Sequence, residues 1–374
     1  MTKIYFAIWA GMVLRVCVAI WNSFWGPSYG AESDALGFHA SAVEYSRNLV
    51  LDQFVTGQFY TYILGIAYSA TTDSLFLGSL LSVCAWVVSA VTLAAVMNML
   101  SIHNSNKYKA MLIFALLPSS ILLTSVTLRE SYQLLFVNVA IFSALKIYMH
   151  KLERHWLMLI AAVGGMGVLH GALLASGVIM TIGIALLLMF RTKKRIPFIR
   201  ICLFIPVIAA FSYIGFSLFL NISYDLKDGL DVAVATYQQG TIDGGGRARY
   251  RSELKIDGLL DLLFSAPVFL FQYLFEPLPW RVSALEDIVH LLENCLRAWL
   301  IVLVFFSFKN SLGQERRLLL FIFASYLLME AIWSLGTSNW GTAIRHHIPG
   351  MGLLVLSAFF KPGLISNNRK IVRL

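Results

Sequence analysis

Charged side chains are scarce in this chain of 374 residues, where Asp, Glu, Lys and Arg together make up 13% of the sequence. A soluble domain carries roughly 25% charged residues. Apolar runs near the roughly 20 residues needed to cross a bilayer recur instead, and they continue to the C-terminal end. The composition therefore excludes an ordinary soluble enzyme with an anchor and predicts one membrane domain over residues 1–374.

Cysteine is scarce as well: the chain has four, and Cys17, Cys84, Cys202 and Cys295 all fall inside apolar runs. There they act as small apolar side chains, which excludes a disulfide framework and a cysteine metal site. No grouping of His, Cys, Asp and Glu has the spacing of metal ligands, so we expect neither a metal nor a cofactor.

Signals of nucleotide and nucleic-acid binding are missing too. The glycine run at residues 244–246 is not followed by the Gly-Lys-Ser/Thr of a P-loop. The net charge of +9 is the other candidate signal. Membrane proteins collect Lys and Arg on their cytoplasmic side, so this charge indicates an orientation. We expect no nucleic-acid partner.

The apolar runs predict an all-α polytopic membrane protein with about ten transmembrane helices plus interfacial or re-entrant helices. We expect spans at residues 4–21, 75–100, 110–126, 133–149, 201–220, 288–308, 318–335 and 348–360, and two short ones within 157–190. His170-Gly171 is the expected bend between these two, because glycine permits a turn and a buried histidine is costly. A further apolar stretch, 259–274, could dip into the membrane.

Lys and Arg gather in alternate loops, which sets the expected orientation. If 191–195 is cytoplasmic, the basic loops at 107–109, 146–154 and 309–317 and the basic tail fall on the same side, as the positive-inside bias requires. All these loops alternate correctly between the two sides of the membrane only if residues 59–70, a short aromatic stretch, do not cross it and form an interfacial or re-entrant helix. Both termini are then cytoplasmic, with extracytoplasmic loops at 22–74 and, the largest, at 221–287.

Arginines on the extracytoplasmic side run against this bias, so a function should hold them there. Those expected on that side are Arg47, Arg129, Arg247, Arg249, Arg251, Arg281, Arg297 (at a span end) and Arg345. A guanidinium binds phosphate through two parallel hydrogen bonds. The set therefore predicts a site for a lipid-linked phosphate or diphosphate; anchoring to lipid headgroups is the alternative for some of them.

The polar segment 336–349 separates two apolar runs and carries Arg345, His346 and His347 side by side. Three such groups at a membrane boundary are costly unless something anionic lies against them. We expect Arg345, with His346 or His347, to bind the phosphate of a lipid-linked donor as it leaves the sugar, and Asn339 to bind substrate. The alternative is an ordinary polar loop with a basic membrane anchor.

Asp34 is the predicted catalytic base in the first extracytoplasmic loop. Transfer of a sugar from a lipid phosphate to a hydroxyl needs a base to take the acceptor's proton, and cations to stabilise the departing phosphate. Glu32 and Glu44 are alternatives for the base, and His39 and Glu44 complete the predicted catalytic set. A lone Asp in a loop is more often the cap of a helix, here one that begins near residue 35.

Arg129 and Glu130 lie in a tight turn at the start of a span, and we assign both to substrate binding. A structural ion pair within the turn is the alternative. His170, in the expected bend, most simply satisfies a backbone group.

The large loop 221–287 supplies the remaining predicted binding residues. Arg247, Arg249 and Arg251 follow its glycine run, and this pattern predicts a flexible segment that closes over substrate. Trp280, beside Arg281, could stack on a sugar ring, as could Trp340 in the later segment. Anchoring at the membrane interface is the commoner role of such residues.

The first loop, Ser-Asp-Ala-Leu-Gly-Phe-His at 33–39, resembles the Asp-bearing first loop of the C-type glycosyltransferase (GT-C) superfamily, polytopic enzymes that use polyprenyl-phosphate sugars. Residues 58–62 and the span after them look like the family's juxtamembrane helix and following span, and residues 117–130 like its next hairpin. Segments 275–280 and 338–347 are similar to glycosyltransferase-like or O-antigen-polymerase-like membrane proteins of bacterial surface-polysaccharide clusters. The resemblance implies the role of catalytic base for Asp34 alone.

The chain departs from the protein mannosyltransferases of that superfamily, because it has no Asp-Glu pair at this position and no large soluble β domain. This favours a glycan or lipid acceptor over a protein. We therefore expect a glycosyltransferase or polymerase of the bacterial inner membrane, inverting, that takes a polyprenyl-phosphate-linked or polyprenyl-diphosphate-linked sugar, with other polysaccharide-assembly proteins as candidate partners. The rival functions are a lipid-linked glycan transporter, or flippase, and a non-catalytic assembly partner. Arg15 alone is clearly mid-span, which counts against a flippase.

Overall fold

The computed structural model describes residues 2–27, 32–48, 59–150, 154–191, 248–250 and 258–360, and its named elements in those ranges are helices. Six helices there are long and apolar enough to cross a membrane. They are α1 (Thr2–Phe24), α4 (Leu75–Met99), α7 (Glu130–His150), α9 (Gly171–Arg191), α13 (Leu285–Asn310) and α14 (Gly313–Leu335). This agrees with an all-α, multi-pass membrane protein.

Shorter helices account for the difference from the expected ten spans. They are α2 (Glu32–Asn48), α3 (Phe59–Ala70), α5 (Asn104–Leu116), α6 (Pro118–Leu123), α8 (His155–Leu169), α12 (Leu259–Phe275), α15 (Trp340–His347) and α16 (Met351–Ala358), with a 3-10 turn at Pro279–Arg281. The expected span 110–126 is broken into α5 and α6, and 348–360 yields only α16. The expected span 201–220 lies outside the described residues.

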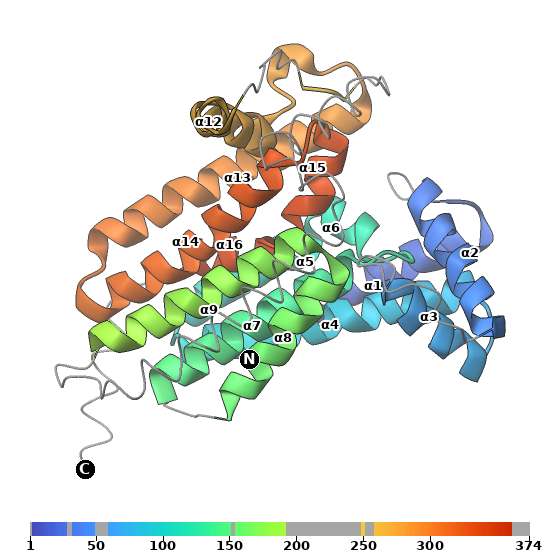
Figure 1. Ribbon diagram of the computed structural model, residues 1–374, viewed down its shortest axis with the longest axis horizontal. Helices are drawn as coiled ribbons and strands as arrows, with labels where there is room; N and C mark the ends of the chain where they lie inside the picture. Colours follow the sequence, from blue (N-terminus) through green and yellow to red (C-terminus); the bar gives the residue numbers. More distant parts are fainter. Residues whose placement is uncertain are drawn as a thin grey trace.

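The helices form two packed groups that meet along α9 and α16 (Figure 1). In one group α4 and α8 pack on α7, and α1 packs on α4 and α5; in the other α13 and α14 pack on α16. All residues of α16 are buried, which is why this short apolar helix belongs to the core. Gly352 permits its close approach to α7, because a Cβ there would lie 2.1 Å from the Asn138 side-chain oxygen.

The helices α2 and α3 pack against each other at one end of the molecule, to the right in Figure 1. Gly65 of α3 permits this, since a Cβ there would lie 2.9 Å from the Ala42 carbonyl oxygen. The 12 residues of α3 extend for only about 18 Å at the usual rise of ~1.5 Å per residue. Its length agrees with the expected interfacial helix at 59–70. The expected bend at His170 is also present, because α8 ends at Leu169 and α9 begins at Gly171.

Pro118 interrupts the expected span at 110–126. Proline has no backbone N–H and cannot continue a helical hydrogen-bond ladder, so backbone groups around it lose their partners. The freed Ala115 carbonyl accepts a hydrogen bond of 2.8 Å from Arg15 of α1. The freed Ser119 N–H donates one of 2.8 Å to Glu293 of α13. Two buried charged side chains from distant helices therefore replace the missing backbone bonds, as broken helices at membrane depth require.

Arg15 is fully buried, and all three nitrogens of its guanidinium donate hydrogen bonds within the protein. It donates to Thr124 Oγ1 at 2.7 Å and to Ser120 Oγ at 3.0 Å, and it stacks on the Trp86 ring with 3.6 Å to the ring centroid. Arg15, the mid-span arginine considered for the transporter alternative, is therefore a structural residue that stabilises the break between α5 and α6.

Candidate functional site

Three charged residues from distant parts of the chain meet at the end of the bundle where α2 begins: Asp34 of α2, Glu130 of α7 and Arg345 of α15. We call them the ion triad. Arg345 Nε donates to Glu130 Oε1 at 2.8 Å and its Nη2 lies 2.8 Å from the same oxygen, while Nη1 pairs with Asp34 Oδ2. The Glu130 side chain is 4% exposed and that of Asp34 52%. The buried carboxylate anchors the guanidinium, and the other carboxylate stays open to solvent.

Local structure places each member of the triad. Glu130 is the first residue of α7, where the helix dipole favours a negative charge. Asp34 is the third residue of α2, which begins at Glu32, so it does not cap a helix beginning near residue 35. The positive charge of Arg345 is in turn stabilised chiefly by Glu130, and this raises the pKa of the guanidinium above its usual range. A structural ion pair within the turn was the alternative to substrate binding for Arg129 and Glu130; the carboxylate of Glu130 pairs with Arg345 of α15.

Side chains of α2 and the α8–α9 junction surround the triad. Arg129 donates to the Leu169 carbonyl at 3.2 Å and its guanidinium lies 5.8 Å from the centre of the Phe38 ring. His39, next along α2, is 2.8 Å from the Tyr68 hydroxyl through Nδ1. Burial lowers the pKa of His39, against the opposing charge of Asp73. His39 is therefore neutral near pH 7 and could exchange protons through the hydroxyl.

The consecutive residues Arg345, His346 and His347 point in different directions, so they do not act together as the expected clamp. Asn339 begins α15 by accepting a hydrogen bond of 2.7 Å from the Thr342 N–H, the usual geometry of an Asn cap. Each residue of a helix is rotated by about 100° from the one before. Arg345 consequently faces α2 and α7, whereas His347, two residues later, faces almost the opposite way.

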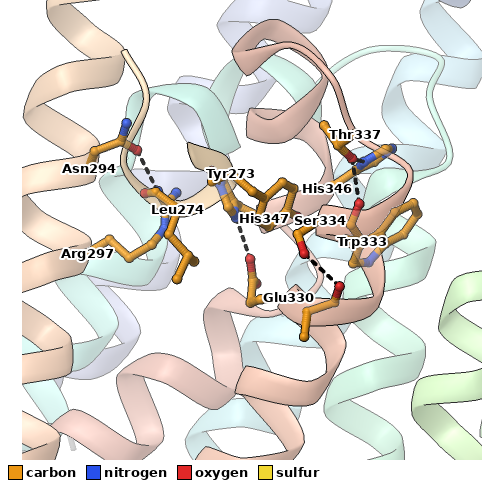
Figure 2. Close-up of polar contacts among 11 residues, drawn as sticks. Tyr273, Leu274, Asn294, Arg297, Glu330, Trp333, Ser334, Thr337, His346 and His347 are labelled. Atoms are coloured by element: carbon orange, nitrogen blue, oxygen red, sulfur yellow. Dashed lines mark hydrogen bonds and ion pairs between the residues drawn. The ribbon is translucent and has the colours of Figure 1, made fainter. Parts of the chain in front are cut away.

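His346 lies between these two directions against α14. Its ring stacks on Trp333 with 3.8 Å between centroids, and its Nδ1 is 2.9 Å from the Thr337 hydroxyl (Figure 2). The centre of the His170 ring is 6.0 Å from that of His346. Burial first, and then the proximity of His170, lower the pKa of His346. A neutral imidazole in such a setting offers little positive charge to a phosphate.

His347 points into the bundle, where it belongs to a group that we call the buried polar cluster: Tyr273, Asn294, Arg297, Glu330 and His347 (Figure 2). Its Nδ1 is 2.5 Å from Glu330 Oε2, and its Nε2 is 3.0 Å from the Tyr273 carbonyl oxygen. Arg297 donates to the Leu274 carbonyl at 2.8 Å and to Asn294 Oδ1 at 2.5 Å. Arg297 lies near the middle of α13, not at the span end expected from sequence.

A small cavity adjoins the buried polar cluster. Its volume is about 10 Å³, and its polar lining comes from Ser119, Arg297, Tyr326 and His347. A space of this size holds about one water molecule if polar partners surround it. Gly350 leaves room for the cluster from the other side, because a Cβ there would lie 2.5 Å from Glu330 Oε1.

Other predicted binding residues gather around the buried ring of Trp340, apart from the triad. Arg281 pairs with Glu276 at 2.8 Å, donates to the Arg249 carbonyl at 2.6 Å and lies 4.9 Å from the Trp340 ring centre. Asn339 is bridged in antiparallel fashion to Arg249. Trp340 is only 2% exposed and donates to Asp287 at 3.0 Å, so a sugar ring cannot stack on it in this conformation. Trp280, by contrast, is 78% exposed.

The remaining predicted site residues lie elsewhere or outside the described ranges. Glu44 is exposed on α2, and ten residues beyond Asp34 it lies about 15 Å further along the helix axis at ~1.5 Å per residue. Glu32 begins α2. Arg247 and Arg251 lie outside the described residues.

Sequence reasoning missed Glu330, Glu293 and Tyr273. The signal for the first two was available, because each is a lone acidic residue within an expected span (318–335 and 288–308), and such residues mark functional or structural polar sites. Tyr273 carried no such signal, since its backbone carbonyl is the group that matters.

No protein-family model, curated protein or solved structure matches this chain. The likeness of short segments to the C-type glycosyltransferases is therefore carried below as a proposal.

Proposed function

We propose that this protein is a membrane glycosyltransferase or polymerase of surface-polysaccharide synthesis. It transfers a sugar or oligosaccharide from a polyprenyl-phosphate or polyprenyl-diphosphate donor to a hydroxyl of a glycan or lipid acceptor, on the extracytoplasmic face of a bacterial inner membrane. The observation that carries the proposal is the ion triad, in which a half-exposed carboxylate on a short amphipathic helix is bound to an arginine held by a buried carboxylate.

The triad offers the two functions that this chemistry needs. Asp34 takes the proton of the acceptor hydroxyl as its oxygen attacks the anomeric carbon. The bond from that carbon to the phosphate oxygen breaks, its electron pair stays on the phosphate, and the configuration inverts. Arg345 carries five N–H donors, of which Glu130 and Asp34 occupy three. The other two are available to stabilise the departing phosphate.

Glu130 supports the reaction without touching substrate. Its carboxylate fixes the guanidinium of Arg345 through Nε and Nη2, so the donors facing Asp34 keep one orientation. Arg129, bound to the Leu169 carbonyl, adds a second positive charge beside the triad. Both histidines of α15 are neutral, so the charges of Arg129 and Arg345 balance those of Asp34 and Glu130 before the reaction. Once Asp34 has taken the proton of the acceptor, it is neutral, and the charge of Arg345 is left to stabilise the phosphate.

The test measures turnover by purified protein in proteoliposomes that contain a polyprenyl-diphosphate oligosaccharide and a glycan acceptor. Asp34→Asn, which keeps the shape but cannot take a proton, and Arg345→Ala should each abolish product. Asp73→Asn is the matched control, since this half-exposed carboxylate at the same end pairs only loosely with Arg47, at 3.7 Å. Full activity of both triad variants would reject the mechanism. Loss of activity in Glu44→Gln with an active Asp34→Asn would move the base to Glu44.

A lipid-linked glycan transporter is the second candidate, and one observation favours it. Arg297 and Glu330 are buried within helices of membrane-spanning length, and such residues often line ion or substrate paths. Movement of a lipid-linked oligosaccharide across the vesicle bilayer, without a new glycosidic bond, would favour this function. Turnover of the donor by the isolated protein excludes a merely non-catalytic assembly partner.

A further inference from the structure

The imidazole of His347 has only one tautomer that satisfies its surroundings. Its Nε2 lies 3.0 Å from the Tyr273 backbone carbonyl. A carbonyl oxygen only accepts hydrogen bonds, so Nε2 must carry a hydrogen. In the neutral ring, Nδ1 is then an acceptor.

Glu330 imposes a second requirement on the same ring. Its Oε2 lies 2.5 Å from His347 Nδ1 (Figure 2). An ionised carboxylate oxygen is also only an acceptor. Two acceptors at this distance repel each other, so one proton must lie between them: either on the carboxyl group with a neutral imidazole, or on Nδ1 with an ionised carboxylate. In both forms the pair binds one proton and is electrically neutral overall.

We propose that Glu330 and His347 form a proton-binding site inside the helical bundle, and that its single proton fastens α15 to α14. When the proton leaves to solvent water, the Glu330 carboxylate and the bare Nδ1 are left facing each other, and the contact between the helices breaks. The site is independent of the proposed function, since it follows from hydrogen-bond chemistry alone.

Titratable groups around the pair come from α12, α13, α14 and α15, and they permit both states. They are Tyr273 of α12, Arg297 of α13, Tyr326 of α14 and His346 of α15 itself, with Glu293 of α13 bonded to Ser119 beside the cavity. Burial, followed by the positive charge of Arg297, lowers the pKa of His347. The proton therefore rests on the carboxyl group. After it leaves, Arg297 compensates the negative charge that remains.

The consequence reaches the ion triad because one short helix carries both contacts. Arg345 and His347 are two residues apart in α15, a helix of 8 residues. His347 anchors one face of this helix to Glu330, and Arg345 anchors the opposite face to Asp34 and Glu130. Release of the first anchor frees the helix to turn, and so changes the position of the guanidinium at the triad.

Hydrogen exchange of the α15 amides as a function of pH tests the site on the native protein in detergent. After correction for the intrinsic exchange rate, protection of α15 should fall tenfold per pH unit between the pKa of the pair in the open state and its higher pKa in the closed state, because one proton is lost on opening in that window. Glu330→Gln keeps a neutral side chain whose N–H can donate to Nδ1, so its protection should not change with pH. Glu330→Ala should lack the protection throughout.

Glu293→Gln is the matched control, because Glu293 is another buried carboxyl of the bundle but accepts from a backbone N–H. It should keep the pH dependence of the native protein. Infrared difference spectra give an independent readout: a protonated-carboxyl band should titrate with α15 protection, be lost in Glu330→Gln and persist in Glu293→Gln. Protection of native α15 that is independent of pH, or a pH dependence that survives Glu330→Gln, would overturn the proposal. The native result decides even if a variant fails to fold.

Discussion

The ion triad and the buried polar cluster each contain a buried glutamate and an arginine, and α15 contributes a residue to both, but they differ in exposure to solvent. In the triad, the Asp34 side chain is 52% exposed. In the cluster, Glu330 is fully buried and its partner His347 is 7% exposed. An exposed carboxylate can exchange a direct ion pair for water or a ligand at little cost. A buried one must keep either its proton or its partner. We infer that the first region suits chemistry on a substrate and the second suits control of position.

The largest expected effect separates the two regions by activity. Asp34→Asn should lower the rate of glycosyl transfer by about 10²- to 10⁴-fold, the usual contribution of a general base, without loss of fold. Glu330→Gln keeps the contact with His347 and should leave most of the activity at neutral pH. Rates in proteoliposomes measure both. Equal losses in the two variants would contradict the division of roles.

The second prediction concerns stability, for which the buried polar cluster should matter more than the ion triad. Glu330→Ala leaves the buried Nδ1 of His347 without its hydrogen-bond donor and a cavity beside it, and should cost about 2–5 kcal/mol of stability. Asp34→Ala removes a half-exposed partner and should cost about 0–1 kcal/mol. Unfolding of the two variants in mixed micelles measures the difference. If Asp34→Ala proved the more damaging, the triad would be structural.

Acid should destabilise the protein because the imidazoles of His170 and His346 are buried in their neutral form. Burial lowers the pKa of His170 to about 3 and also lowers that of His346, while a histidine in the unfolded chain titrates near ~6.5. The unfolded state then binds more protons below that pH, so stability falls as the pH falls from about 6.5. The slope should approach ~2.7 kcal/mol per pH unit for two protons. Unfolding curves at several pH values check it, and His346→Gln should halve the slope.

The smallest expected effect concerns the space beside Glu330. Gly350→Ala places a Cβ 2.5 Å from the carboxyl oxygen, and such overpacking costs about 1–3 kcal/mol. Gly336→Ala is the control, because nothing lies within 4 Å of its added Cβ. The shift should appear in the α15 hydrogen exchange as well as in the melting temperature. An unchanged Gly350→Ala protein would mean that Glu330 has more freedom than the packing indicates.

The sequence predicted the class of fold, the bend at His170 and one long-range contact, but not the helix α15 or the break at Pro118. Outward arginines and Asp34 led to the expectation that residues 311 positions apart come together, as Asp34 and Arg345 do. Segment 336–349 was interpreted as a loop, although Asn339 before Trp-Gly-Thr indicates a capped helix. With α15 recognised, the rotation of about 100° per residue would have separated Arg345 from His347.

The break at Pro118 shows a different limit. The proline was visible, but its consequence depends on Arg15 and Glu293, which lie far away along the chain. Local pattern cannot show which distant side chain will satisfy a freed backbone group. The expectation of one continuous helix over 110–126 was wrong for this reason.

The same break has a consequence for how the protein is made. Arg15 enters the membrane with the first helix, long before its acceptors at residues 115–124 are synthesised, and Ser119 waits for a carboxylate 174 positions further along the chain. Chain growth at about 5–20 residues per second leaves the interrupted helix without its second partner for many seconds. Nascent chains that stop short of α13 should therefore be the ones that membrane proteases recognise and remove.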